Sequence, residues 1–246
     1  MSPLIFGSMR MSEDKGDEHY WAKLLCQAYY AGIDTIHSSS EYDSFSLLQK
    51  VLKEVSLIDS TIVFKHIVKL AEPHFSDHRY SSNRLKEKVR NYLSIFEIDE
   101  LEAMQWMWRS SLSDTQRIDG FIKQQEQMRH DIKDLKQSGL VGSALCFPYS
   151  VEFMEKALQS NIFDGFCVYR NPQELEYDRI LTDCDDGTVV SIRPFSADKA
   201  LIESEGVIKL LEYNFLEPAI KSTILSISSV YQLNEIKGYL NAQKNI

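Results

Sequence analysis

The chain has 246 residues, of which 43% are apolar and 26% are charged, proportions that are ordinary for a soluble globular protein. Its 36 acidic residues outnumber its 27 lysines and arginines, and the formal charge of -9 argues against nucleic acid or an anionic membrane as a partner. The purely apolar runs span only a few residues, whereas a membrane span needs about 20, so we expect no transmembrane segment.

The amino terminus and the cysteines favour the cytoplasm. Residues 1–7 have neither the basic region nor the long apolar region of a signal peptide. The 4 cysteines lie far apart and form no Cys-x-x-Cys pair, so we expect reduced, buried thiols and no metal site. Glycines and prolines are scattered singly, which predicts one domain over residues 1–246.

Two periodicities alternate along the first half of the chain. Short apolar runs predict strands, and stretches with apolar residues at i, i+3, i+4 and i+7 predict helices. In chain order we expect a strand at 4–6, a helix at 19–32, a strand at 33–37, a helix at 45–55, a strand at 61–67 and a helix at 82–96. Ser82 is the expected cap of the last of these helices.

The second half repeats the pattern. We expect strands at 101–106, 140–146, 165–169, 188–193 and 222–226. Helices are expected at 117–138, 150–159, 172–184, 197–216 and 230–242, with Ser150 as the cap of the second. Eight strand–helix units in this length predict an α/β fold, a single-domain (β/α)8 TIM barrel. The alternative, an open doubly wound sheet, is less favoured because no Gly-x-Gly-x-x-Gly follows the first strand.

In such a barrel the active site lies at the carboxyl-terminal ends of the strands, which we call the barrel mouth. A tyrosine and a lysine from neighbouring strands could meet there, and the lysine could lower the pKa of the phenol and make it a usable proton donor. Trp106 and Trp108 lie two residues apart on one strand, and we expect them to line the mouth and contact substrate. Arg10 and Arg193 follow strands and could hold an anionic substrate or a cofactor phosphate.

Several segments together resemble the aldo-keto reductases. The first strand and turn, Phe-Gly-Ser-Met-Arg-Met, and the segment from Gly32 to Tyr42 are similar to signatures of that family. Further similar segments are Val63-Phe64-Lys65, Ser138-Gly139-Leu140-Val141 and Ser228-Ser229-Val230-Tyr231-Gln232-Leu233. The resemblance runs over nearly the whole chain, and it implies a TIM barrel that reduces a carbonyl compound with NADP or NAD as cofactor.

The family's catalytic tetrad is Asp, Tyr, Lys and His, and the resemblance places its tyrosine on Tyr42 and its lysine on Lys65. The aspartate position carries His37, and the histidine position carries Gln105. A neutral His37 could accept a hydrogen bond, and Gln105 could still donate one to a carbonyl oxygen. The resemblance therefore implies that Tyr42 protonates the carbonyl, Lys65 tunes it and Gln105 orients the substrate.

The same resemblance locates the cofactor. It implies phosphate contacts from Ser228, Ser229 and Gln232 at the start of the last helix, with Ser226 and Arg193 nearby. The family's nicotinamide-binding Ser-Asn pair falls on Phe147-Pro148, its glutamine near Cys167 and its stacking ring near Ile192. These positions carry no strong side-chain donor.

Three functions are compatible with these residues. The first is a carbonyl reductase that uses NADP or NAD and acts on a small molecule. The second is a catalytically inactive barrel that binds a ligand or a protein partner, which the substitutions in the tetrad and at the nicotinamide positions would explain. The third is different chemistry on a sugar-like substrate through His37 and Glu41.

Overall fold

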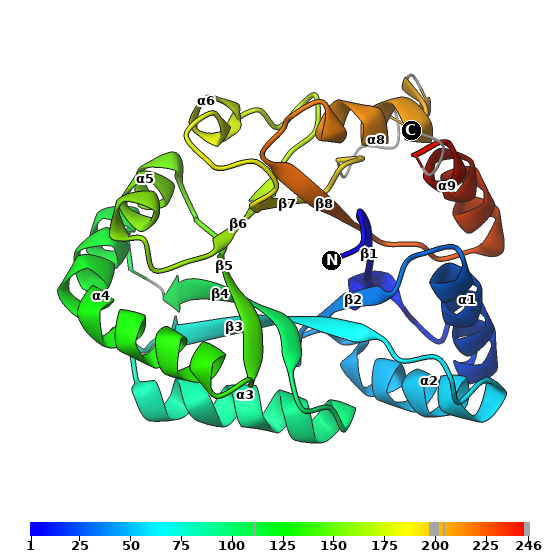
Figure 1. Ribbon diagram of the computed structural model, residues 1–246, viewed down its shortest axis with the longest axis horizontal. Coiled ribbons are helices and arrows are strands. Elements are labelled where there is room, and N and C mark those ends of the chain that lie inside the picture. Colours follow the sequence, from blue (N-terminus) through cyan, green and yellow to red (C-terminus); the bar gives the residue numbers. More distant parts are fainter. Residues whose placement is uncertain (111, 197–201, 204, 244–246) are drawn as a thin grey trace.

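Eight parallel strands close into a barrel, and helices surround it (Figure 1). The structure is a computed structural model that describes residues 1–110, 112–196, 202–203 and 205–243. Every strand pairs with the next one in sequence, and β8 pairs with β1, so the predicted (β/α)8 TIM barrel is confirmed. No helix in the described part of the chain is long and apolar enough to span a membrane.

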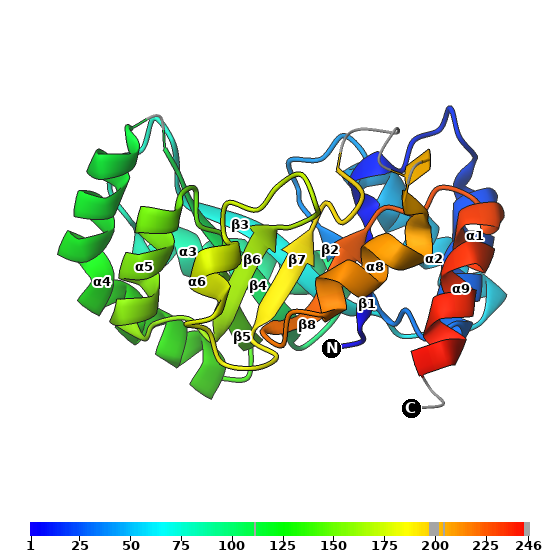
Figure 2. The same ribbon diagram turned by 90° about the horizontal axis from the view of Figure 1, so that it is seen from above.

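The strands are β1 (Leu4–Gly7), β2 (Thr35–Ser38), β3 (Lys65–Phe75), β4 (Leu101–Ser110), β5 (Val141–Cys146), β6 (Gly165–Tyr169), β7 (Val189–Ile192) and β8 (Ile220–Leu225). The helices are η1 (Ser8–Arg10), α1 (Glu18–Tyr30), α2 (Phe45–Ile58), α3 (Ser82–Phe96), α4 (Asp114–Gln137), α5 (Val151–Ser160), α6 (Asp178–Leu181), α8 (Val207–Phe215) and α9 (Val230–Gln243). Figure 2 shows the barrel from the side, with the N-terminus at the end where the strands begin.

Alternating side chains divide the apolar core into an interior and an outer layer. Ile67 and Ala103 belong to the cluster that fills the barrel. Val68 and Met104, one residue further along the same strands, belong to the cluster between the barrel and the helices. This alternation follows from the two-residue period of a strand. At Gly165 a Cβ atom would lie 1.8 Å from the carbonyl oxygen of Thr188, so only glycine allows β6 to lie this close to the backbone at Thr188.

Serine side chains cap the N-termini of several helices. Ser150 accepts a hydrogen bond from Phe153 N at the start of α5, as expected. Ser113 forms a capping box with Gln116 at the start of α4. At α3 the cap is Ser81 and not Ser82, because the Ser82 hydroxyl instead donates to the buried Asp131.

Four predicted elements differ most from the observed ones. β3 begins four residues later than predicted and continues to Phe75, and β4 continues to Ser110. The helix expected at 172–184 is a single turn, Asp178–Leu181, because the chain before it forms a turn in which Asn171 bridges to Glu174. Of the helix expected at 197–216, residues 197–201 and 204 lie outside the described residues, and α8 covers Val207–Phe215.

The long strands β3 and β4 extend beyond the barrel, pairing as far as Phe75 and Ser110. The register shifts between Ala71 and His74 along this extension. It therefore carries His74 and Arg109 past the end of the barrel, on the side where the strands end.

Candidate active site

Three polar side chains face the barrel interior near its mouth: His37 on β2, Lys69 on β3 and Gln105 on β4. Lys69 pairs with Gln105 in the register of the two strands. The residues two positions before them, Ile67 and Ala103, belong to the interior cluster, so Lys69 and Gln105 face inward as well. His37 follows Ile36, which packs in the outer layer, so His37 also faces inward.

His37 and Gln105 form a buried hydrogen bond. The two atoms, His37 Nε2 and Gln105 Oε1, lie 2.5 Å apart, and since the amide oxygen only accepts, His37 donates from Nε2. The pKa of His37 is lowered to about 4, chiefly by burial and to a lesser extent by the charge of Lys69, while the hydrogen bond to Gln105 acts in the opposite direction. His37 is therefore neutral at pH 7, and the Gln105 amide group still has donors to offer a ligand.

Tyr42 lies beside this pair, in the turn that follows β2. Its ring centroid is 6.3 Å from that of His37, and the Lys69 Nζ atom lies 5.5 Å from the Tyr42 ring centroid. Burial raises the pKa of Tyr42, with neighbouring phenols adding to the rise and the charge of Arg109 opposing it. Tyr42 is therefore a protonated phenol at neutral pH and has a proton to donate.

The lysine beside Tyr42 is Lys69, so the prediction that Lys65 takes this place is wrong. Lys65 is the first residue of β3 and lies at the opposite end of the barrel. Its side chain is 48% exposed and pairs with Asp34 at 3.4 Å. The reason is the late start of β3: the strand was expected to end near Ile67, whereas Ile67 lies close to its beginning.

Lys69 stands among groups that favour its neutral amine. Burial lowers the pKa of Lys69, and the positive charge of Arg109 lowers it further, while Glu41 acts in the opposite direction. Glu41 is itself engaged, because it forms an ion pair with Arg109 and lies 2.9 Å from His74 Nε2. These contacts of Glu41, together with the burial of His37, do not favour the acid–base chemistry on a sugar that the sequence left open.

Aromatic rings from β5 and β6 complete the mouth. Phe147 packs edge to face against both Tyr149 and Tyr169, with centroids 5.4 Å apart in each case. Arg193 lies over the Tyr169 ring at 4.3 Å, and it approaches Glu174 at 3.5 Å. The mouth thus combines phenol rings with guanidinium and amine groups, a surface suited to a polar, electron-rich ligand.

Trp106 and Trp108 do not line the mouth, which corrects the prediction that they contact substrate. Both side chains are 0% exposed and belong to the outer layer between the barrel and the helices. Trp106 packs against Phe121 of α4 and Phe153 of α5, and its Nε1 donates to the Glu72 carbonyl oxygen at 2.9 Å. The strand alternation explains this, because Gln105 before them and Met107 between them face inward.

Four of the five residues predicted for phosphate binding lie between the end of β8 and the first turn of α9, whereas Arg193 lies over Tyr169. Gln232 Oε1 accepts from the Ser228 backbone N at 2.8 Å and from the Ser228 hydroxyl at 3.1 Å. Gln232 N donates to Ser229 Oγ at 3.2 Å. Ser226 is half-buried directly after β8. This end offers hydroxyls, an amide group and the backbone N–H groups of a helix start, which fit the diphosphate of a dinucleotide.

The predicted nicotinamide end offers different contacts. Phe147 and Cys167 are buried in the barrel interior, and Ile192 packs against the same cluster. These side chains fit a flat ring by apolar contact but give its amide no strong donor. Arg10, which was predicted to bind substrate, is exposed in η1 after β1, and its carbonyl oxygen accepts from Lys15.

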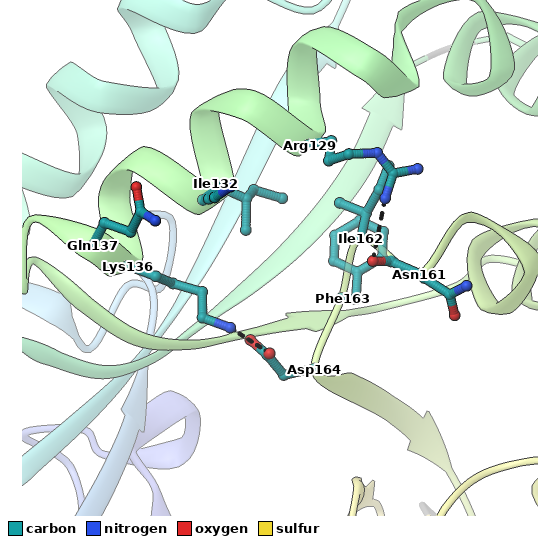
Figure 3. Close-up of a pocket in the computed structure, with 9 residues that line it drawn as sticks. Arg129, Ile132, Lys136, Gln137, Asn161, Ile162, Phe163 and Asp164 are labelled. Carbon is teal, nitrogen blue, oxygen red and sulfur yellow. Dashed lines mark hydrogen bonds and ion pairs between the residues drawn. The ribbon is translucent and has the colours of Figure 1, made fainter.

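Two cavities lie in the helical layer, away from the mouth. One of about 300 Å³ lies between the end of α4 and the loop before β6, and two of the charged side chains that line it are already engaged (Figure 3). Arg129 donates to the Ser160 carbonyl oxygen at 2.7 Å, and Lys136 pairs with Asp164. The second, of about 440 Å³, lies between α3 and α4. Neither is lined by a residue that the sequence predicted for catalysis or for cofactor or substrate binding.

One group of possible metal ligands occurs in the described part of the chain, namely His130, Asp131 and Asp134 on α4. Asp131 is buried, and it already accepts from Tyr80 at 2.9 Å and pairs with Lys86 at 3.1 Å. This carboxylate holds α3 to α4, and its contacts account for its burial without an ion.

Sequence reasoning missed Lys69 and Arg109 as site residues. A signal for Lys69 was present, because the apolar run around it continues as far as Glu72-Pro73, and a strand through that run places Lys69 on the same face as Ile67. Arg109 had no such signal. It reaches the mouth only because β4 extends beyond the barrel, paired with the extension of β3.

Comparison with solved structures places the fold. A candidate aldo-keto reductase from Pseudomonas aeruginosa matches with a TM-score of 0.72 and 18% identity, over 99% of this chain and 91% of that one. The holo form of an aldo-keto reductase from Bacillus halodurans matches with a TM-score of 0.68 and 15% identity, over 98% and 86%. An aldo-keto reductase from Klebsiella pneumoniae in complex with NADPH matches with a TM-score of 0.66 and 13% identity, over 97% and 85%.

No family model and no curated protein matches the sequence. The solved structures share the barrel over nearly the whole chain. At these identities they establish the fold, so the resemblance noted in the sequence is confirmed at that level.

Proposed function

We propose that this barrel, whose fold is that of the aldo-keto reductases, is an oxidoreductase that reduces a small carbonyl compound with NADPH or NADH. The observation that supports the proposal most is the convergence of Tyr42, Lys69 and the His37–Gln105 pair at the mouth. A bound nicotinamide dinucleotide would supply the hydride to the carbonyl carbon. Ser226, Ser228, Ser229, Gln232 and Arg193 would hold its phosphates.

The chain's own residues would act on the carbonyl oxygen. The Gln105 amide would donate to this oxygen and orient it, because its own Oε1 is fixed by His37. Tyr42 would give the oxygen its phenolic proton as negative charge develops there. The positive charge of Arg109, and that of Lys69 when protonated, would stabilise the resulting phenolate.

Replacement of the phenol tests this mechanism. Tyr42→Phe keeps the ring and removes the proton donor, so turnover of aldehydes with NADPH or NADH should fall by at least about 100-fold, a typical contribution of general acid catalysis. Tyr30→Phe is the matched control, because Tyr30 is 65% exposed at the end of α1 and bonds to Asp59, away from the mouth. Steady-state oxidation of the cofactor measures both variants, and wild-type turnover in Tyr42→Phe would refute the mechanism.

A second candidate is a barrel that binds a carbonyl ligand or a protein partner without redox chemistry. The observation in its favour is the apolar lining at the nicotinamide end, with Phe147, Cys167 and Ile192 in place of strong donors. It predicts that aldehydes bind at the mouth while neither dinucleotide binds. A calorimetric titration with each kind of ligand distinguishes the two functions.

A further inference from the structure

Lys69 holds a primary amine inside the barrel mouth without a carboxylate partner. The other lysines of this part of the structure are paired: Lys65 with Asp34, and Lys88 with Glu72. Lys69 forms no ion pair with any carboxylate in the described part of the chain. Its side chain is half-buried, and its Nζ stands over the Tyr42 ring.

The groups around Lys69 come from each element packed against it. β2 supplies His37, which is neutral at pH 7, and the turn after β2 supplies Tyr42 and Glu41. β4 supplies the uncharged Gln105 and the cation Arg109. Glu41 is the ion-pair partner of Arg109 and does not pair with Lys69. Burial and the charge of Arg109 lower the pKa of Lys69, and the charge of Glu41 opposes them. Desolvation and a neighbouring cation are the two conditions that activate a lysine as a nucleophile.

We propose that Lys69 is a carbonyl-trapping nucleophile that forms an imine with small aldehydes at the barrel mouth. This activity goes beyond the proposed reduction, because it requires no dinucleotide. The residue type at position 37 supports this proposal. A carboxylate there would face Lys69 and stabilise its ammonium form, whereas the neutral imidazole of His37 does not.

The step balances without an oxidant or reductant. The Nζ lone pair of Lys69 forms a bond to the carbonyl carbon, and the carbonyl π pair moves to the oxygen, which takes the phenolic proton of Tyr42. The nitrogen then returns a proton to the Tyr42 phenolate. Tyr42 then protonates the hydroxyl, the carbon–oxygen bond breaks, and water leaves as the nitrogen lone pair forms the carbon–nitrogen double bond. The nitrogen gives its remaining proton to the Tyr42 phenolate, which restores the phenol.

Reductive trapping tests the proposal on the wild-type protein. Incubation with propionaldehyde and cyanoborohydride converts each imine into a stable secondary amine, which peptide mass spectrometry assigns to a lysine. Lys65 is the internal control, since it lies on the same strand but is exposed and paired with Asp34. We expect Lys69 to be modified at least about tenfold faster than Lys65 near pH 7, because the Lys69 amine is half-buried beside a cation whereas the Lys65 amine is exposed and paired with Asp34.

Two variants and a pH series complete the test. Lys69→Arg keeps the positive charge and should abolish the fast modification, whereas Lys65→Arg should leave it unchanged. The rate at Lys69 should also reach its plateau below the pH that an ordinary lysine amine requires, because burial lowers the pKa of Lys69. Equal modification rates at the two lysines of the wild-type protein would overturn the proposal. The trapping experiment contains no dinucleotide, so it is independent of the proposed reduction. Lys69 can form the imine in a protein that does not reduce aldehydes, and a protein that reduces aldehydes can fail to form the imine.

Discussion

At the scale of single residues, two buried histidines stand out. His37 is 5% exposed and bonded to Gln105, and His66 is 3% exposed and stacks on Phe96 with centroids 4.0 Å apart. Burial lowers the pKa of each to about 4, from 6.5. Between pH 6.5 and about pH 4, each histidine binds a proton in the unfolded chain but not in the folded chain. The free energy of unfolding therefore falls as pH drops through this range.

His66→Phe should weaken this pH dependence. The phenyl ring keeps the stacking on Phe96 and removes the titrating group, and the loss of stability between about pH 7.5 and about pH 5 should shrink by about 2 kcal/mol. Denaturant titrations at the two pH values measure the difference. The control is His78→Phe, because His78 is exposed in the loop after β3. An unchanged pH dependence in His66→Phe would contradict a neutral, buried His66.

At the scale of elements, the β3–β4 extension depends on a buried carboxylate. Glu72 is 0% exposed and accepts from Arg84 at 2.8 Å, from Lys88 at 3.2 Å and from the Ser81 backbone N at 3.1 Å. Arg84 and Lys88 belong to α3, so these contacts join the helix to the strand that carries Lys69 and His74. The two cations are partly exposed, at 41% and 36%, whereas the carboxylate is not.

This asymmetry predicts which replacement destabilises more. Arg84→Met leaves the charge of Glu72 buried with one partner fewer, and it should reduce the free energy of unfolding by about 3 kcal/mol. Glu72→Gln removes the buried charge, and the two cations can then turn toward water. It should therefore reduce the free energy of unfolding by less than Arg84→Met does. Chemical denaturation of both variants gives the order, and a more stable Arg84→Met protein would contradict this account.

The boundaries of these elements show where sequence reasoning was sufficient. The helix at 82–96 and the strand at 165–169 were predicted with the bounds the structure has, because a strong apolar stripe and a glycine mark them. The bounds of β3 were predicted wrongly. Residues 61–71 are apolar over most of their length, so the pattern does not show at which residue pairing with β2 begins. That one shift of register moved the lysine of the site from Lys69 to Lys65.

At the scale of the whole molecule, the order of strands and helices was enough to predict the closed barrel, because parallel strands require crossovers. The candidate site was predicted only in part. Tyr42, His37 and Gln105 follow from the ends of β2 and β4, whereas Arg109 reaches the mouth through pairing outside the barrel. The side chains of Trp106 and Trp108 were predicted on the wrong face of β4. Successive residues of a strand point to opposite faces, so an error of one residue exchanges the barrel interior for the outer layer.

The whole-molecule arrangement also determines how the central claim can be measured. The three tryptophans are 0% exposed, and Trp106 and Trp108 lie in the outer layer, so their fluorescence reports poorly on the mouth. Isothermal titration calorimetry with NADPH and with NADH measures binding directly. A carbonyl reductase should bind at least one of them at micromolar affinity or tighter, which is about −8 kcal/mol or better. The absence of binding heat at millimolar concentrations of both dinucleotides would contradict the assignment of this barrel as a reductase.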